Sequence, residues 1–210
     1  HVGPRRCRAP SLPLANCGGL RCDAGVTLVC LTSIPPRFAT LGETLETLLD
    51  QGADGVVLSL PRRFVRFPAA HDAPPLPAGV TLLRTDRDDG PLTKLVAPLR
   101  RWPDARIAIC DDDCLYAPGW LAALDDVARR TTVACGSAWS VRRLRRAGKA
   151  DGHDVAQGFS GVLFPEDTFD GGIFDPPRSA WSVDDVWIAG QLARRGRSLC
   201  PSPAARGCVT

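Results

Sequence analysis

The 210-residue chain contains no methionine, only two lysines and only three glutamates, so its 26 basic residues are mostly arginine and its 23 acidic residues mostly aspartate. It starts at His1, and we therefore expect either a removed initiator or a piece of a longer protein. The longest apolar runs, Val26–Leu31 and Val56–Leu60, are far shorter than the ~20 residues that cross a bilayer. The sequence predicts no transmembrane segment.

The composition excludes several unusual classes of protein. Nine cysteines in 210 residues are too few for a disulfide scaffold, and the odd number leaves at least one unpaired within the chain. Hydrophobic residues at 44% and charged residues at 23% exclude a disordered, collagenous or coiled-coil chain. The net charge of +3 is too small to imply a polyanionic partner, so no nucleic acid is expected. The absence of a P-loop argues against the common type of ATP use.

From residue 26 onward, short apolar runs alternate with amphipathic stretches. The expected strands span 26–31, 56–60, 80–83, 106–110, 132–135 and 161–164, and the expected helices lie near 41–51, 92–102, 118–127 and 182–192. This alternation predicts one α/β domain with a mainly parallel central sheet flanked by helices. We place the domain at 26–200, after an irregular extension at 1–25 and before a tail at 201–210.

Local signals refine the expected helices. Thr40 and Glu43 have the spacing of a capping box on the first helix, and Pro98 is expected to kink or divide the second. In the last helix, we expect Val183, Val186, Trp187 and Leu192 to face inward.

In parallel sheets, ligands bind beyond the carboxyl ends of the strands. Asp111, Asp112 and Asp113 directly follow the strand at 106–110, where a loop can turn two carboxylates toward one cation. Such oxygen ligands suit Mn²⁺ or Mg²⁺ shared with phosphates. A solvated acidic turn is the alternative, because aspartate is abundant in this chain. Adjacent carboxylates after a buried strand repel one another, which favours a cation site.

Two expected helix starts supply further polar groups. The segment Asp89–Lys94 combines a turn with backbone N–H groups that can face an anion, and Lys94 adds a positive charge. Ser182 and Asp185 have the spacing of a helix cap. Asp184 and Asp185 therefore either stabilise the helix start or supply a general base beside a cleft.

Other candidates also have structural interpretations. The turn Gly158–Gly161 allows close approach of a ligand or simply a tight bend. Trp181 could stack on a sugar or fill the core, whereas Trp187 has the spacing of a core residue. The cluster Arg142–Arg146 is typical of a solvated face, and His153 of a loop.

Taken in order, five segments resemble small nucleotide-sugar glycosyltransferases of the GT-A fold, such as the family-2-like enzymes of bacterial polysaccharide clusters and large algal viruses. The segments are Leu31–Arg37, Gly90–Lys94, Ile109–Asp113 with Tyr116, Gly158–Gly161 and Asp184–Trp187. The resemblance implies a Rossmann-like GT-A domain. It also implies metal-dependent transfer of a sugar from a nucleotide-sugar donor to a hydroxyl of a glycan or glycoconjugate acceptor, with inversion at the anomeric carbon.

The same resemblance implies roles for individual residues. Asp113 and Asp111 would hold Mn²⁺ or Mg²⁺, and Asp185, or else Asp184, would be the catalytic base. The residues expected to bind the nucleotide sugar are Thr32, Ser33, Arg37, Asp89, Lys94, Asp111 and Asp112. Those expected to bind the acceptor are Gly158, Phe159, Ser160 and Trp181.

Two other classes of function remain open from the sequence. In a metal-dependent phosphoryl transferase or nuclease, Asp111, Asp113 and Asp185 would surround two ions while Arg142–Arg146 follows a phosphate backbone. In a non-catalytic binding module, the acids would hold a structural cation. The sequence does not distinguish the cytosol from a Golgi-type lumen.

Overall fold

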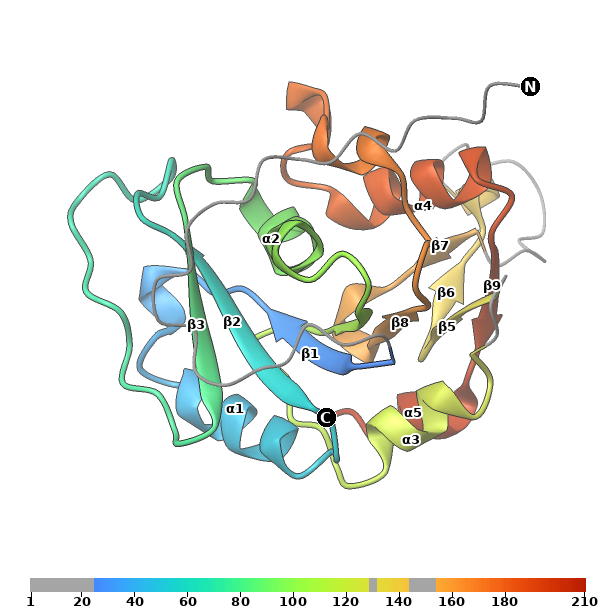
Figure 1. The fold of residues 1–210 in the computed structure, drawn as a ribbon, viewed down its shortest axis with the longest axis horizontal. Coiled ribbons are helices and arrows are strands. Elements are labelled where there is room, and N and C mark those ends of the chain that lie inside the picture. Colours follow the sequence, from blue (N-terminus) through green and yellow to red (C-terminus); the bar gives the residue numbers. More distant parts are fainter. Residues whose placement is uncertain (1–24, 129–131, 144–153) are drawn as a thin grey trace, which may run out of the picture.

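The computed structural model describes residues 25–128, 132–143 and 154–210. The main sheet has seven strands in the order β3-β2-β1-β4-β8-β5-β9, and a small second sheet pairs β6 with β7 (Figure 1). The strands are β1 (Thr27–Leu31), β2 (Gly55–Pro61), β3 (Val80–Thr85), β4 (Arg106–Ile109), β5 (Thr132–Cys135), β6 (Ala138–Trp139), β7 (Val155–Ala156), β8 (Val162–Phe164) and β9 (Ser198–Pro201).

Helices cover both faces of the main sheet, which confirms the predicted α/β domain. They are α1 (Leu41–Leu49), α2 (Thr93–Arg101), α3 (Trp120–Asp125), α4 (Asp184–Arg194) and α5 (Pro203–Gly207). In Figure 1, α2 and α4 lie on one face, and α1, α3 and α5 lie on the other. Within the described ranges, no helix has both the length and the apolar character that crossing a membrane requires.

Because helices pack on both faces of the main sheet, its central strands are largely apolar. In β1, Leu28 and Cys30 belong to the core under α2 and α4, while Val29 and Leu31 belong to the core over α1 and α3. Side chains along a strand alternate between faces, so a strand that is covered on both sides is mostly apolar, although β2 contains the fully buried Ser59. The four residues of β1 named above are also fully buried.

One strand runs against the others, and this places a turn at the functional edge. β8 is antiparallel to β4 and to β5, whereas the other neighbouring pairs of the sheet are parallel. The first residue of β8, Val162, is therefore opposite the last residue of β4, Ile109. As a result, the turn before β8 lies at the same edge as the residues that follow β4.

Local capping signals were less reliable than the apolar pattern. The Thr40 side chain forms no cap on α1 and instead donates to the carbonyl of Arg37. The cap predicted at Ser182 is also wrong, because α4 begins at Asp184 with Val183 before it and no side-chain cap. The helix α2 runs undivided through Pro98.

The orientation predicted for the last helix is partly wrong. Val183 and Val186 are 45% and 38% exposed, whereas Leu192 is buried and Trp187 packs against the core. Ile188 and Gln191 complete the buried face. Val183 precedes the first residue of α4, and the buried face of the helix also includes Asp184.

The segment from 201 to 210, which we expected to be a tail, is folded onto the domain. Ser202 caps α5 by accepting a hydrogen bond from the backbone of Ala205. The helix α5 packs against α3, and Val209 forms a β-bridge with Tyr116. Residues 1–24 lie outside the described residues.

We expect Gly161→Ala to destabilise the fold more than Gly119→Ala. Both glycines have positive φ, +90° and +89°, so both substitutions strain the backbone. A Cβ at Gly161 would also overlap the indole of the fully buried Trp120, whereas a Cβ at Gly119 meets nothing within 4 Å. The extra loss of unfolding free energy should be about 1–3 kcal/mol, measured by urea denaturation. Equal losses would contradict the packing described here.

Candidate active site

A cavity of about 320 Å³ lies at the edge where β1, β2 and β4 end. Residues that follow these strands form its walls, together with the turn before α2 and the first residues of α4. It is the type of crevice in which α/β proteins bind ligands.

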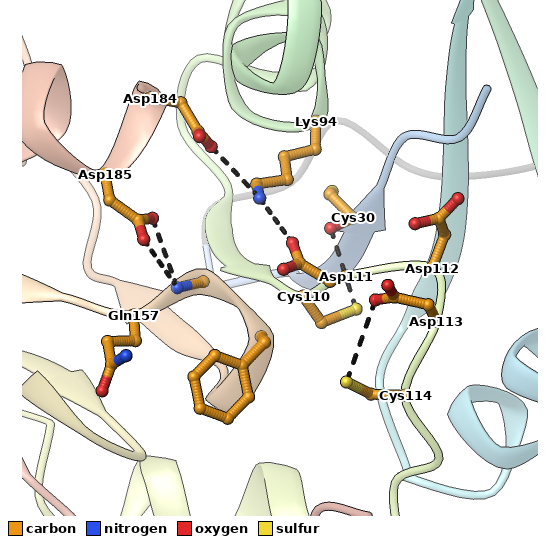
Figure 2. A network of polar contacts seen from close by, with 12 residues as sticks. Cys30, Lys94, Cys110, Asp111, Asp112, Asp113, Cys114, Gln157, Asp184 and Asp185 are labelled. Carbon is orange, nitrogen blue, oxygen red and sulfur yellow. Dashed lines mark hydrogen bonds and ion pairs between the residues drawn. The ribbon is translucent and has the colours of Figure 1, made fainter. Parts of the chain in front are cut away.

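Lys94 occupies the centre of the charged end of this cavity. Its side chain is 5% exposed, and its Nζ lies 2.7 Å from Asp111 Oδ1 and 3.1 Å from Asp184 Oδ2 (Figure 2). Burial alone would lower the pKa of Lys94, but the two carboxylates outweigh burial and raise it. The ammonium group therefore stays charged and links the end of β4 to the start of α4.

Asp185 is the neighbouring carboxylate, and its environment is different. Its Oδ1 and Oδ2 lie 3.2 and 3.4 Å from the backbone nitrogen of Gly158, which donates to them. Burial and the charge of Asp184 raise the pKa of Asp185 to about 7, although Lys94 acts in the opposite direction. A carboxylate that exchanges its proton near neutral pH is suited to general-base catalysis.

The turn at Gly158 lies directly beside the charged side chains, and a larger residue there would be tightly packed. A Cβ at this position would lie 3.0 Å from Lys94 Nζ and 3.2 Å from Asp185 Oδ1. Tyr116 fixes the turn against the strand end, since its hydroxyl donates to the carbonyl of Phe159 and accepts from the backbone of Asp111. The glycine thus allows Lys94, Asp185 and Asp111, whose Oδ1 would lie 3.4 Å from such a Cβ, to approach the backbone closely.

The three consecutive aspartates have three different environments. Asp111 faces Lys94. Asp112 is 5% exposed and accepts hydrogen bonds from Ser33 Oγ at 2.5 Å and Arg37 Nη1 at 2.6 Å. Asp113 is 51% exposed and pairs with Arg37 Nη2 at 2.9 Å. Asp112 is therefore anchored in the protein, while the outer two carboxylates border open space.

The outer carboxylates, Asp111 and Asp113, have the oxygen ligands that a divalent cation prefers. In the described part of the chain, no group of three or more His, Cys, Asp or Glu side chains is arranged to hold an ion alone. Mg²⁺ and similar ions often bind one or two carboxylates and take their other ligands from phosphates and water. Asp111 and Asp113 could supply such a pair. The three-acid cluster required by the phosphoryl transferase interpretation does not form in these residues.

Most of the predicted donor and catalytic residues line the cavity. They are Thr32, Ser33, Arg37, Lys94, Asp111, Asp112, Asp184 and Asp185, together with Trp181 from the predicted acceptor set.

Five predicted residues do not line it. Asp89 is 3% exposed and pairs with Arg87 and Arg100. Ser160 is fully buried and bonds to Ser137. The others are Asp113, Gly158 and Phe159.

Sequence reasoning missed one wall of the cavity. Phe64, Arg66 and Phe67 line it from the loop after β2, and Asp88 lines it from the turn after β3. These residues also follow strand ends, and that position is the signal that could have identified them. Of the basic cluster, Arg142 is exposed; residues 144–153, which include His153, lie outside the described residues.

The layered sheet and the charged cavity at its carboxyl edge define an α/β protein with a crevice beyond the strand ends. A similar solved structure is the mannosyltransferase PcManGT from Pyrobaculum calidifontis in complex with GDP-Man and Mn²⁺. The TM-score is 0.53 and the identity 17%, over 86% of this chain and 55% of that one. The likeness shows a shared fold, and this chain spans about half the length of that protein. No family model and no curated protein sequence matched the chain.

We expect Asp185→Asn to stabilise the protein at pH 8 and to have little effect at pH 4. The folded-state pKa of about 7 lies above the unfolded value of about 3.9, so the folded state binds more protons between these limits. Wild-type stability should therefore fall as pH rises through this window. Asparagine removes the charge and keeps an oxygen for Gly158. The gain at pH 8 should be on the order of 2–4 kcal/mol.

Thermal and urea unfolding at several pH values would measure this gain. Asp86→Asn is the control, because Asp86 is 94% exposed. An unchanged or lower stability of Asp185→Asn at pH 8 would show that Asp185 is not held at a raised pKa.

Proposed function

We propose that this protein transfers a sugar from a nucleotide-sugar donor to a hydroxyl of a glycan or glycoconjugate acceptor, with Mn²⁺ or Mg²⁺ and with inversion. The observation that carries the proposal is the charged end of the cavity, where Lys94 joins Asp111 to Asp184 beside a carboxylate with a pKa near 7. The similar mannosyltransferase structure, which contains GDP-Man and Mn²⁺, supports the same class of reaction.

On the donor side, Asp111 and Asp113 would hold the cation together with the donor diphosphate. When bound, the cation supplies positive charge that offsets the negative charge on the leaving nucleotide. Lys94 is fixed beside Asp111 and adds a second positive charge at this end of the cavity. Arg37 holds Asp112 and Asp113 in place from the loop after β1.

On the acceptor side, Asp185 removes the proton of the acceptor hydroxyl. The acceptor oxygen forms a bond to the anomeric carbon while the bond to the leaving phosphate oxygen breaks, and the nucleotide departs with that electron pair. Attack from the face opposite the leaving group inverts the anomeric carbon. Asp184 is paired with Lys94, whereas among the described residues Asp185 accepts hydrogen bonds from the backbone N–H of Gly158 alone, so Asp185 is the better base.

We expect nucleotide release from a sugar donor to require Mn²⁺ or Mg²⁺ and to increase as pH rises through about 7. Asp185 is protonated below this pH and cannot accept the acceptor proton. A panel of UDP-, GDP-, dTDP- and CMP-sugars would identify the donor. Asp185→Asn should lower kcat by about 10²–10⁴-fold while donor binding is kept.

The control for this experiment is Asp86→Asn, which removes an exposed carboxylate away from the charged centre. Asp113→Asn should raise the Mn²⁺ concentration needed for half-maximal rate. The proposal fails if no sugar nucleotide is turned over with either metal, or if Asp185→Asn and Asp113→Asn behave like the wild type.

A further inference from the structure

The cavity has an aromatic wall to which the transfer chemistry assigns no role. It comes from the residues just after β2, where Phe67 is half-buried and Phe64 lies behind it, 7% exposed. The ring of Phe64 packs edge-on against Phe67, with centroids 6.4 Å apart, and against Phe38, at 6.2 Å. Phe67 is therefore supported from behind and borders the cavity. Arg66 is exposed at the rim.

This wall lies at the opposite end of the cavity from the charged centre. The charged centre is built on the end of β4, the turn before β8 and the start of α4, whereas Phe67 follows β2. One strand, β1, separates β2 from β4 in the sheet. With neighbouring strands about 4.8 Å apart, the end of β2 is on the order of 10 Å from the end of β4, which Asp111 follows. The cavity thus has one charged end and one aromatic end.

Asp88 connects the aromatic wall to the rest of the cavity. Its carboxylate accepts hydrogen bonds from the backbone nitrogens of Val65, at 2.7 Å, and Gly90, at 2.8 Å. Its carbonyl accepts from Trp181 Nε1 at 3.1 Å. Gly90 has φ +61°, and a Cβ there would lie 2.6 Å from the carbonyl oxygen of Trp181. Three segments of the cavity rim therefore converge on Asp88.

Resting on the proposed function, we infer that the aromatic wall binds the nucleobase of the donor, with Phe67 as the stacking surface, and that Asp88 is a positioning residue that holds this wall in place. The diphosphate and the sugar are assigned to the charged end, because Asp111, Lys94 and the proposed catalytic base Asp185 line the cavity there. The nucleoside is the part of the donor that remains for the other end. A planar base gains affinity by stacking on an aromatic ring.

The inference separates two contributions to donor affinity. A nucleoside diphosphate would contact both ends of the cavity, whereas inorganic pyrophosphate with Mn²⁺ would contact only the charged end. Loss of the aromatic wall should therefore weaken binding of the nucleoside diphosphate and leave binding of pyrophosphate with Mn²⁺ unchanged.

We expect Phe67→Ala and Asp88→Ala to weaken binding of the preferred nucleoside diphosphate by about 5- to 100-fold. Pyrophosphate with Mn²⁺ should bind within about twofold of the wild type. Calorimetry on the full chain would measure both ligands. In the transfer reaction, the donor KM should rise by a similar factor while kcat is kept.

Conservative variants and a matched control make the test specific. Phe67→Tyr keeps the ring, and Asp88→Asn keeps one acceptor oxygen, so each should recover most of the lost affinity. Asp86→Ala removes a carboxylate from the same turn, but Asp86 is 94% exposed and pairs only with the exposed Arg62 among the contacts described. This control should bind both ligands like the wild type.

Several results would overturn the inference. If folded Phe67→Ala and Asp88→Ala bind the nucleotide as the wild type does, the inference is wrong and the proposed function is unaffected. The same conclusion holds if only the acceptor KM rises. Equal weakening of nucleotide and pyrophosphate would show that the variants disturb the whole cavity. If the wild type binds pyrophosphate with Mn²⁺ but no nucleoside diphosphate, both the inference and the proposed function fall.

Discussion

The ion pairs of Lys94 are the interaction on which the candidate site depends. An ammonium group that is 5% exposed is costly to bury, and it remains in the fold only because Asp111 and Asp184 lie within 3.1 Å. These acids come from two different elements, the loop after β4 and the start of α4. The pairing therefore fixes the distance between a strand end and a helix start, and with it the shape of the charged end of the cavity.

The direction of β8 has an equally large effect on the site. Parallel strands bring only their carboxyl ends to one edge, whereas an antiparallel strand brings its amino end there. Because β8 is antiparallel to β4, the backbone N–H of Gly158 reaches Asp185 at the edge where Asp111 also lies. If β8 were parallel to β4, the turn that precedes it would lie at the opposite edge of the sheet. The backbone N–H of Gly158 would then be far from Asp111.

The sequence predicted the features that depend on short-range patterns. The apolar runs identified all strands of the main sheet except β9. The rule on carboxyl ends identified Asp111 as a candidate, and an expected helix start identified Lys94. The sequence could not give the direction of β8, since a buried apolar run looks the same for a parallel and an antiparallel strand. Nor could the sequence show which of the three consecutive aspartates is held by other side chains of the protein and which two border open space. Asp112 is anchored by Ser33 and Arg37, which are 79 and 75 residues away in the chain.

The failed cap at Ser182 has the same cause. Its spacing to Asp185 matches a cap, but both acids that follow it have partners from other elements, Lys94 on α2 and Gly158 before β8. Tertiary contacts with a buried cation outweigh a local cap of about 1 kcal/mol. The two neighbouring carboxylates are thereby separated in function. Asp184 neutralises Lys94, and Asp185, with a weaker set of donors and the charge of Asp184 beside it, is left as the group that gains and loses a proton near neutral pH.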